Sequence, residues 1–154
     1  QEPRVDIVSG VIEEVTGEAE TVILGNVLEH LQDPQATLES IYTRLTPGGH
    51  LLLFVPALPW LFGSLDTAYG HVRRYTPALL RQSLQQASFH LVQLKYFNLP
   101  GCLSWFLASK MFRWKTVKPW SVTVYDQLVV PWIARIEQHW SPPVGQSLVA
   151  IARK

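Results

Sequence analysis

The first third of the chain alternates between apolar blocks and mixed blocks, a pattern that indicates a strand, a helix and a second strand. Val22–Leu24 and Leu51–Val55 are uncharged apolar runs, as expected for strands buried on both faces of a parallel sheet. Between them, Asp33 and Pro34 suit the cap and first position of a helix that Pro47–Gly49 would end. The apolar side of this helix comprises Leu38, Ile41, Tyr42 and Leu45. This order predicts a right-handed βαβ crossover.

Helical and strand-like patterns of apolar residues continue after the crossover. Thr76 and Pro77 predict the start of a further helix, which should end near Ser88. Its inward stripe would comprise Leu80, Leu84 and Ala87. Apolar and polar residues then alternate through His90–Phe97, which is typical of a strand near the edge of a sheet.

The C-terminal part predicts two helices and a final strand. The helices cover Gly101–Trp114 and Val124–Trp140, and Pro131 should kink or divide the second of them. Gln146–Ala152 is an apolar run that predicts the last strand. At the other end of the chain, Arg4–Val8 resembles a short strand.

Composition limits the class of protein more than its chemistry. With 154 residues, of which 47% are hydrophobic and 16% charged, residues 1–154 are expected to form one domain. A formal charge of +1, without a basic run, argues against nucleic acid as the partner. Cys102 is the only cysteine, which excludes an intrachain disulfide and fits a reducing, cytoplasmic location. The weakly charged window Phe97–Ser109 is too short to span a bilayer.

The tryptophans are concentrated in the second half of the chain. All six lie between Trp60 and Trp140, and most of them lie in the two helices expected before the last strand. With Arg113, Lys115 and Lys118 nearby, these helices could rest on a membrane surface or hold a lipid-like acceptor. The alternative, which we favour, is a small helical cap over about residues 101–141 that packs on the sheet.

Five sequence blocks resemble the class I S-adenosylmethionine-dependent methyltransferases. They are NVLEHLQDP, LTPGGHLLLFVPA, LDTAYGHVRRYTP, QASFHLVQLKYFNLPG and GQSLVAIARK. In order and spacing they resemble a bacterial group with a VLEH turn, a PGG segment and a GHxRRY loop. The resemblance covers nearly the whole chain. It implies an α/β, Rossmann-like, mostly parallel sheet with Gln146–Ala152 as an antiparallel last strand beside Leu53, and a Trp-rich helical insertion before that strand.

One part of the family pattern is missing. The family binds S-adenosylmethionine with a Gly-rich loop after its first strand and an acidic residue on its second, but no Gly-x-Gly occurs in this chain. We therefore expect the chain to be the C-terminal part of a methyltransferase, N-terminally truncated and inactive by itself. An exposed sheet edge is then expected, which a second copy of the chain could cover.

The resemblance also implies cofactor contacts. Asp6 occupies the position of an acid that accepts a hydrogen bond from the adenine amino group, and Ile7 would pack on the ring. The alternative for Asp6 is an ordinary strand-end carboxylate. Asn26 and Val27 would lie along the cofactor, or form a plain turn between strand and helix.

Glu29 and His30 follow in the same turn and are candidate catalytic residues. In some relatives an ExxEH turn and a later histidine, here His71, bind a divalent metal. Because Asn26 replaces the first acid of that motif, we do not predict a metal here. Packing is the other interpretation of His30.

His71 is the best candidate for a general base, because an imidazole can remove the proton of a hydroxyl acceptor near neutral pH. Arg73 and Arg74, followed by Tyr75, could bind an acceptor that carries an oxyanion. Alternatively, one of the two arginines pairs with Asp66 and holds the loop. The predicted function is methyl transfer to a small or lipid-linked acceptor. The alternative is a non-catalytic domain for protein or membrane association.

Overall fold

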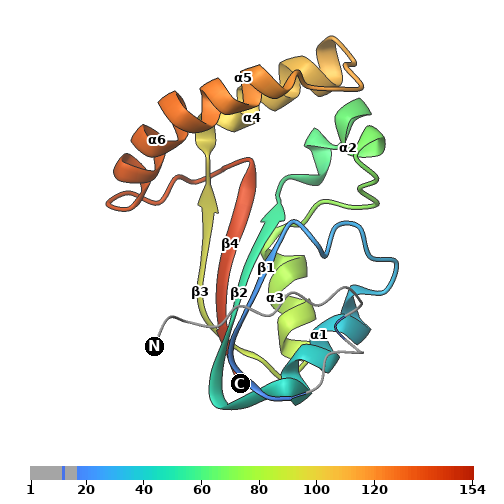
Figure 1. Cartoon of the computed structure of the whole chain (residues 1–154), viewed down its shortest axis with the longest axis vertical. Coiled ribbons are helices and arrows are strands. Elements are labelled where there is room, and N and C mark those ends of the chain that lie inside the picture. The colour runs from blue at the N-terminus through green and yellow to red at the C-terminus, as the bar shows by residue number, and fades with distance from the viewer. Residues whose placement is uncertain (1–11, 13–16) are drawn as a thin grey trace, which may run out of the picture.

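The computed structural model describes residue 12 and residues 17–154, so the predicted strand Arg4–Val8 lies outside the described residues. The described strands form one four-stranded sheet in the order β1-β2-β4-β3 (Figure 1). Their bounds are β1 Ala19–Gly25, β2 Leu45–Pro56, β3 His90–Phe97 and β4 Ser147–Arg153. The sheet is mixed, because β1 and β2 are parallel while β4 runs antiparallel to both of its neighbours.

The predicted crossover is confirmed. Leu24 lies opposite Leu53 in parallel strands, and α1, Pro34–Arg44, connects them. The side chain of Asp33 caps this helix by accepting hydrogen bonds from two backbone N–H groups at 3.1 Å. Pro47–Gly49 does follow the helix, but these residues belong to the start of β2. Ala19 of β1 pairs with Leu45 and Thr21 pairs with His50, so the residues of β2 between Leu45 and His50 form a bulge within the strand.

The last strand lies where the sequence predicted. Ala150 of β4 is opposite Leu53 of β2 on one side and Leu94 of β3 on the other, antiparallel in both cases. β3 begins at His90 and ends at Phe97, as predicted, and it is an edge strand of the described sheet. β1 forms the other edge, where Ile23 is 72% exposed.

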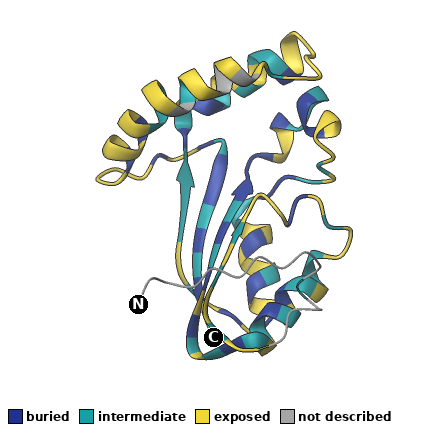
Figure 2. Cartoon of the chain, viewed as in Figure 1, coloured by how far each residue is buried: buried dark blue, intermediate teal, exposed yellow. Residues whose placement is uncertain are grey.

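The core lies between the sheet and two helices on the same side of it (Figures 1 and 2). These are α1 and α3, Pro77–Gln86, and Thr76 caps α3 by accepting the Leu79 N–H at 3.1 Å. Alternate residues of β2 and β4 point towards them, because successive side chains of a strand point to opposite faces. The buried residues of this core include Leu38, Ile41, Leu51, Leu53, Val55, Leu80, Leu84, Leu148 and Ala150.

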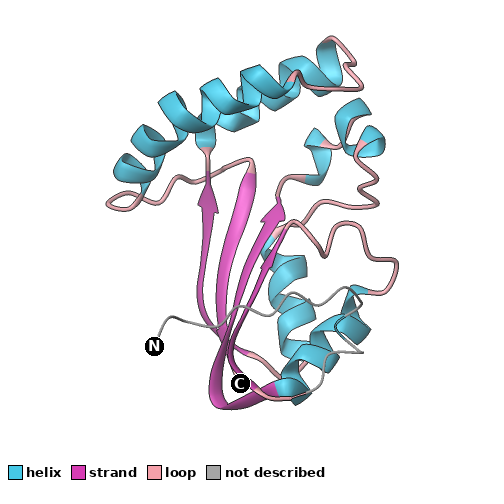
Figure 3. Cartoon of the chain, viewed as in Figure 1, coloured by secondary structure: helices cyan, strands magenta, loops and turns pink. Residues whose placement is uncertain are grey.

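A second group of helices lies beyond the carboxyl ends of β2 and β3 (Figure 3). Two short elements, η2 Pro59–Leu61 and α2 Ser64–Ala68, follow β2. The helical layer before β4 comprises α4 Leu99–Trp105, η3 Phe106–Met111, α5 Pro119–Val124, η4 Tyr125–Val129 and α6 Val130–Glu137.

Both π-helical segments, η3 and η4, lie inside this layer. Pro131 occupies the first turn of α6, where the winding changes from π-helical to α-helical, so the predicted second helix changes near this residue but continues through it. In the described part of the chain, no helix has the length and apolar character needed to cross a membrane.

Candidate functional site

Asp66, in α2, is the centre of the hydrogen-bonded cluster beyond the end of β2. It is fully buried and accepts four hydrogen bonds. The donors are His71 Nδ1 at 2.9 Å, Arg74 Nε at 2.7 Å, Trp105 Nε1 at 3.1 Å and the Gly63 N–H at 3.0 Å. These donors come from three segments, so the carboxylate ties α2 both to the loop that follows it and to α4.

Burial is the largest influence on the Asp66 carboxyl and opposes its ionisation, but hydrogen bonds from His71 and Arg74 outweigh it and lower the pKa. The group is therefore a carboxylate near neutral pH and can only accept hydrogen bonds. It follows that His71 Nδ1 carries a proton. In the neutral imidazole the lone pair is then on Nε2, the tautomer that a general base or a metal ligand needs.

Glu29 faces this free nitrogen from the turn after β1. Its Oε1 lies 4.0 Å from His71 Nε2. The side chain is fully buried, and among the described residues neither carboxylate oxygen has a hydrogen-bond partner. Burial raises the pKa of Glu29, and its own backbone amide and the nearby His71 only partly offset this effect. A buried acid with two unpaired oxygens is costly in a folded protein and suggests a ligand or proton at this point.

His30 completes the group on the solvent side. Its Nδ1 lies 3.2 Å from the Gly70 carbonyl oxygen, and its ring meets that of His71 edge-on with 4.8 Å between centroids. One ligand atom from each of Glu29, His30 and His71 lies within 4.8 Å of the others. Both histidines therefore have Nδ1 beside an oxygen acceptor, as metal-ligating histidines usually do.

The other predicted acceptor-binding residues face inward. Arg74 is buried, pairs with Asp66 and donates to the Ala57 carbonyl at 2.9 Å, so it holds the loop as the alternative interpretation proposed. Arg73 Nη2 donates to two backbone carbonyls, of Leu31 and Gln32, each at 2.9 Å. It therefore fastens the turn that carries His30.

Tyr75 is buried in the core, where its hydroxyl donates to the Leu28 carbonyl at 3.2 Å. Burial raises the pKa of Tyr75 to about 12. Its predicted role in binding an acceptor has no support in this position, since the phenol is already committed to a backbone carbonyl.

Among the described residues, little covers the carboxyl end of β1. Asn26 and Val27 are exposed there, and the Asn26 N–H donates to the Phe54 carbonyl at 2.8 Å. Asn26 has a φ of 53°, and a Cβ added at Gly25 would meet no atom within 4 Å. Asp6 and Ile7, the other two predicted cofactor contacts, lie outside the described residues.

Comparison with known proteins identifies the family. A family model described as a methyltransferase domain matches residues 5–94, more than half of the chain. The chain belongs to the class I S-adenosylmethionine-dependent methyltransferases. This confirms the resemblance seen in the sequence, and S-adenosylmethionine is the cofactor of the family. A search of curated proteins found no match.

Three solved structures share the methyltransferase fold. A Bacillus halodurans protein assigned to the methyltransferases has a TM-score of 0.58 and 19% identity, covering 97% of this chain and 78% of that one. An S-adenosylmethionine-dependent methyltransferase from Archaeoglobus fulgidus has a TM-score of 0.57 and 16% identity, covering 99% and 69%. The [4+2]-cyclase SpnF has a TM-score of 0.59 and 18% identity, covering 98% and 56%. Because a cyclase shares the fold, the reaction must be argued from the site.

A pocket in this methyltransferase domain lies next to the buried cluster. It has a volume of about 620 Å³ and lies between the ends of β2 and β3 and the helical layer. Two residues that line the pocket also contact the cluster. Trp105 donates a hydrogen bond to Asp66, and the centre of the Tyr69 ring lies 6.4 Å from that of His71. Its aromatic walls comprise Phe54, Tyr69, Phe97, Trp105, Trp114 and Tyr125.

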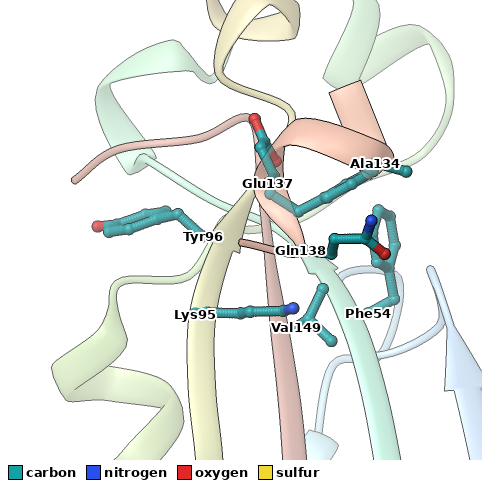
Figure 4. Close-up of a pocket in the computed structure, with 8 residues that line it drawn as sticks. Phe54, Lys95, Tyr96, Ala134, Glu137, Gln138 and Val149 are labelled. Carbon is teal, nitrogen blue, oxygen red and sulfur yellow. The ribbon is translucent and has the colours of Figure 1, made fainter. Parts of the chain in front are cut away.

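A second, smaller pocket, of about 290 Å³, lies between β3 and α6 (Figure 4). Lys95, Tyr96 and Glu137 line it. The carboxylate of Glu137 accepts hydrogen bonds from the backbone N–H groups of Asn98 and Leu99, at 2.8 and 3.0 Å. It therefore caps the start of α4. The candidate acceptor site is the larger pocket, because Trp105 in its wall donates to Asp66.

Sequence reasoning placed His71 and Glu29 in one site but missed the part that Asp66 plays. Asp66 was considered only as a partner for an arginine, although it lies five residues before His71 in the same LDTAYGHVRRY block. Its contact with Trp105 crosses 39 residues. No local pattern indicates such a contact, because it forms only when the helical layer packs over α2.

Proposed function

We propose that the domain transfers a methyl group from S-adenosylmethionine to a hydroxyl oxygen of a small or lipid-linked acceptor bound in the larger pocket. The observation that carries this proposal is the Asp66–His71 pair, with 2.9 Å between Oδ1 and Nδ1. It presents an imidazole with a free Nε2 beside an aromatic pocket, at the same end of the sheet as the exposed residues Asn26 and Val27.

When bound, S-adenosylmethionine supplies an electrophilic methyl group on a sulfonium, whose S–C bond breaks with the electron pair staying on sulfur. His71 Nε2 takes the proton of the acceptor hydroxyl, so that an oxygen lone pair can form the new C–O bond. Asp66 holds the ring through Nδ1 and stabilises the imidazolium that results. The proton then passes from His71, which is 11% exposed, to solvent.

The pocket supports an acceptor with an apolar or aromatic body. Its walls are mainly aromatic, while Asn98 and Gln146 provide a few polar atoms, a combination that orients a ligand within an apolar site. Arg74 is buried against Asp66, so we do not assign it to an oxyanion of the acceptor. Arg73 donates to the backbone carbonyls of Leu31 and Gln32, so its proposed contribution to acceptor binding is indirect: it holds the turn that carries His30.

The test is the steady-state kinetics of His71→Ala in the intact protein, following S-adenosylhomocysteine release with a panel of phenols and long-chain alcohols. Turnover should fall roughly 100-fold or more, since positioned proton transfer typically contributes at least that much, while cofactor affinity should barely change. His90→Ala, an exposed histidine at the start of β3, is the matched control. Normal turnover by His71→Ala between about pH 6 and 9 would leave His71 as a packing residue.

A second form of the site, in which a divalent ion assists the reaction, is favoured by the unpaired Glu29 carboxylate. Glu29, His30 and His71 would hold the ion, and their oxygen and imidazole donors suit Mn²⁺, Fe²⁺ or Zn²⁺. This role excludes the first, because a coordinated Nε2 cannot accept a proton.

Thermal shift with MnCl₂ separates the two forms without an activity assay. A bound ion should raise the melting temperature of the native protein but not that of Glu29→Gln, while Glu39→Gln, an exposed acid on α1, should respond as the native protein does. No shift with Mn²⁺, Fe²⁺ or Zn²⁺ would remove the metal form. If, in addition, no acceptor is methylated, the non-catalytic alternative would be the better interpretation.

A further inference from the structure

An apolar stripe follows the α5–η4–α6 rod and extends into the turn after α6. Its six members recur at every fourth position from Trp120 to Trp140, and all of them are exposed. Their exposed fractions are Trp120 65%, Val124 46%, Leu128 64%, Trp132 63%, Ile136 61% and Trp140 51%. Figure 2 shows exposed residues along the outer side of this rod. Monomeric soluble proteins rarely expose so continuous an apolar surface unless it contacts something.

A π-helical segment lies in the middle of the stripe and reduces its winding around the rod. In an α-helix, four residues advance by about 40° more than one turn, so a strict fourfold repeat would wind around the rod. The segment η4, Tyr125–Val129, holds more residues per turn and therefore offsets part of this winding. The inward positions keep the same spacing, since Val129 is half-buried and Ile133 and Glu137 are buried.

The neighbouring part of the layer adds more apolar surface. Leu103 of α4 is 65% exposed and Met111 of η3 is 60% exposed. Phe112 and Trp114 follow in the connection to α5, with their rings stacked at 5.9 Å between centroids, and both are more than half exposed. Exposed apolar side chains therefore also occur on the α4–η3 arm of the layer and in its connection to α5.

The exposed charges among the described side chains of this layer are basic. Lys110, Arg113 and Lys115 are exposed at the end of η3 and in the connection to α5, and the Arg135 guanidinium lies 5.7 Å from the centre of the Trp132 ring. Among the described side chains of residues 99–140, the only acid is Glu137, which is buried and holds backbone N–H groups. A second copy would bring like charges together, whereas anionic lipid headgroups complement them.

We propose that this layer rests on an anionic lipid bilayer, with the stripe from Trp120 to Trp140 in the headgroup region and the basic residues on lipid phosphates. Tryptophan suits that position because its ring is apolar while its N–H can bond to water or headgroups. The larger pocket has Trp114 and Tyr125 of the same layer in its walls. If the proposed function holds, a lipid-linked acceptor can reach His71 from the bilayer, but membrane binding itself does not depend on that function.

Co-sedimentation with vesicles tests the proposal independently of catalysis. The chain should bind vesicles of phosphatidylcholine with phosphatidylglycerol more tightly than vesicles of phosphatidylcholine alone, and added salt should weaken binding. Ile136→Ser should lower the partition coefficient about 10-fold. Ile23→Ser, which replaces an exposed isoleucine on β1, is the matched control and should bind as the native chain does.

Two further variants assign the separate contributions. Trp120→Ser with Trp132→Ser should abolish binding to both kinds of vesicle. Replacing Lys110, Arg113 and Lys115 by glutamine should remove the preference for anionic vesicles. Each lost charge should lower the partition coefficient on these vesicles about 5-fold. Circular dichroism checks that the variants fold, which is expected because the replaced side chains are exposed.

Three results would overturn the proposal. They are the absence of binding to either kind of vesicle, an equal loss of binding in Ile23→Ser, and a dimer without lipid that Ile136→Ser dissociates in analytical ultracentrifugation. The last result would assign the surface to a second copy of the chain. Because none of these measurements involves methyl transfer, their failure is distinguishable from failure of the proposed function.

Discussion

Asp66→Asn should destabilise the fold strongly, because the Asp66 carboxylate holds four donors in a buried cluster. Asparagine has nearly the same shape and keeps one carbonyl oxygen, so the replacement tests charge and not packing. It leaves the Arg74 guanidinium, which is 1% exposed, without an anionic partner. It also places an NH₂ group where His71 or Trp105 now donates, so at least one of these contacts must break.

The expected loss follows from the burial of the pair. Removing one partner of a buried ion pair typically costs about 3–5 kcal/mol, and the retained carbonyl oxygen puts Asp66→Asn near the lower end, about 3 kcal/mol. In a domain of this size each kcal/mol lowers the melting temperature by roughly 2–4 °C, so a decrease of about 6–12 °C is expected. The Arg74→Met variant should show a comparable decrease in melting temperature, since it leaves the buried Asp66 carboxylate without its cationic partner.

The loss should depend on pH in a definite direction. The pKa of Asp66 is lowered in the folded chain, so the stability it contributes is fully present above the unfolded value of about 3.9 and is lost as pH falls through the folded pKa. The difference between native chain and Asp66→Asn should therefore be constant above about pH 5 and shrink below about pH 4.

Urea unfolding of both proteins over this pH range is the measurement. Asp33→Asn is the matched control, because asparagine caps a helix about as well as aspartate and Asp33 is exposed at the start of α1. A decrease below about 1 kcal/mol, or one that does not change with pH, would show that the cluster is solvated and that Asp66 does not hold His71.

Three further results are expected. Gly101→Ala should lower stability by about 1–3 kcal/mol in urea unfolding, because its Cβ would collide with the paired side chains of Asn98 and Gln146; an unchanged midpoint would contradict that packing. Tyr75→Phe should cost about 0.5–1.5 kcal/mol through the lost bond to Leu28, and a larger loss of activity than of stability would instead indicate a role in the site. In calorimetry, the 154 residues should bind S-adenosylmethionine weakly, since they contain no Gly-x-Gly loop, and micromolar binding would show that the cofactor site was misplaced.

Local interactions explain which parts of the fold could be predicted from the sequence. The caps at Asp33 and Thr76 depend on residues two or three positions away, and the strand His90–Phe97 depends on its own alternation. The crossover and the antiparallel last strand followed from apolar runs and family blocks that occur in the sequence itself. The π-helical turn in the Trp-rich rod was not predicted, because its apolar repeat every fourth residue is close to that of an ordinary α-helix.

The site illustrates the opposite case, in which only the tertiary structure decides. His71 meets Asp66 within one loop, but its contact with Glu29 crosses 42 residues, and Trp105 reaches Asp66 across 39. Charge states also depend on this packing, because desolvation raises the pKa of Glu29 while converging donors lower that of Asp66. The sequence alone determined the family and the candidate residues for the proposed chemistry. Folding decided which carboxylate orients the imidazole and which one is left buried without a partner, since desolvation and hydrogen-bond partners exist only after the chain packs.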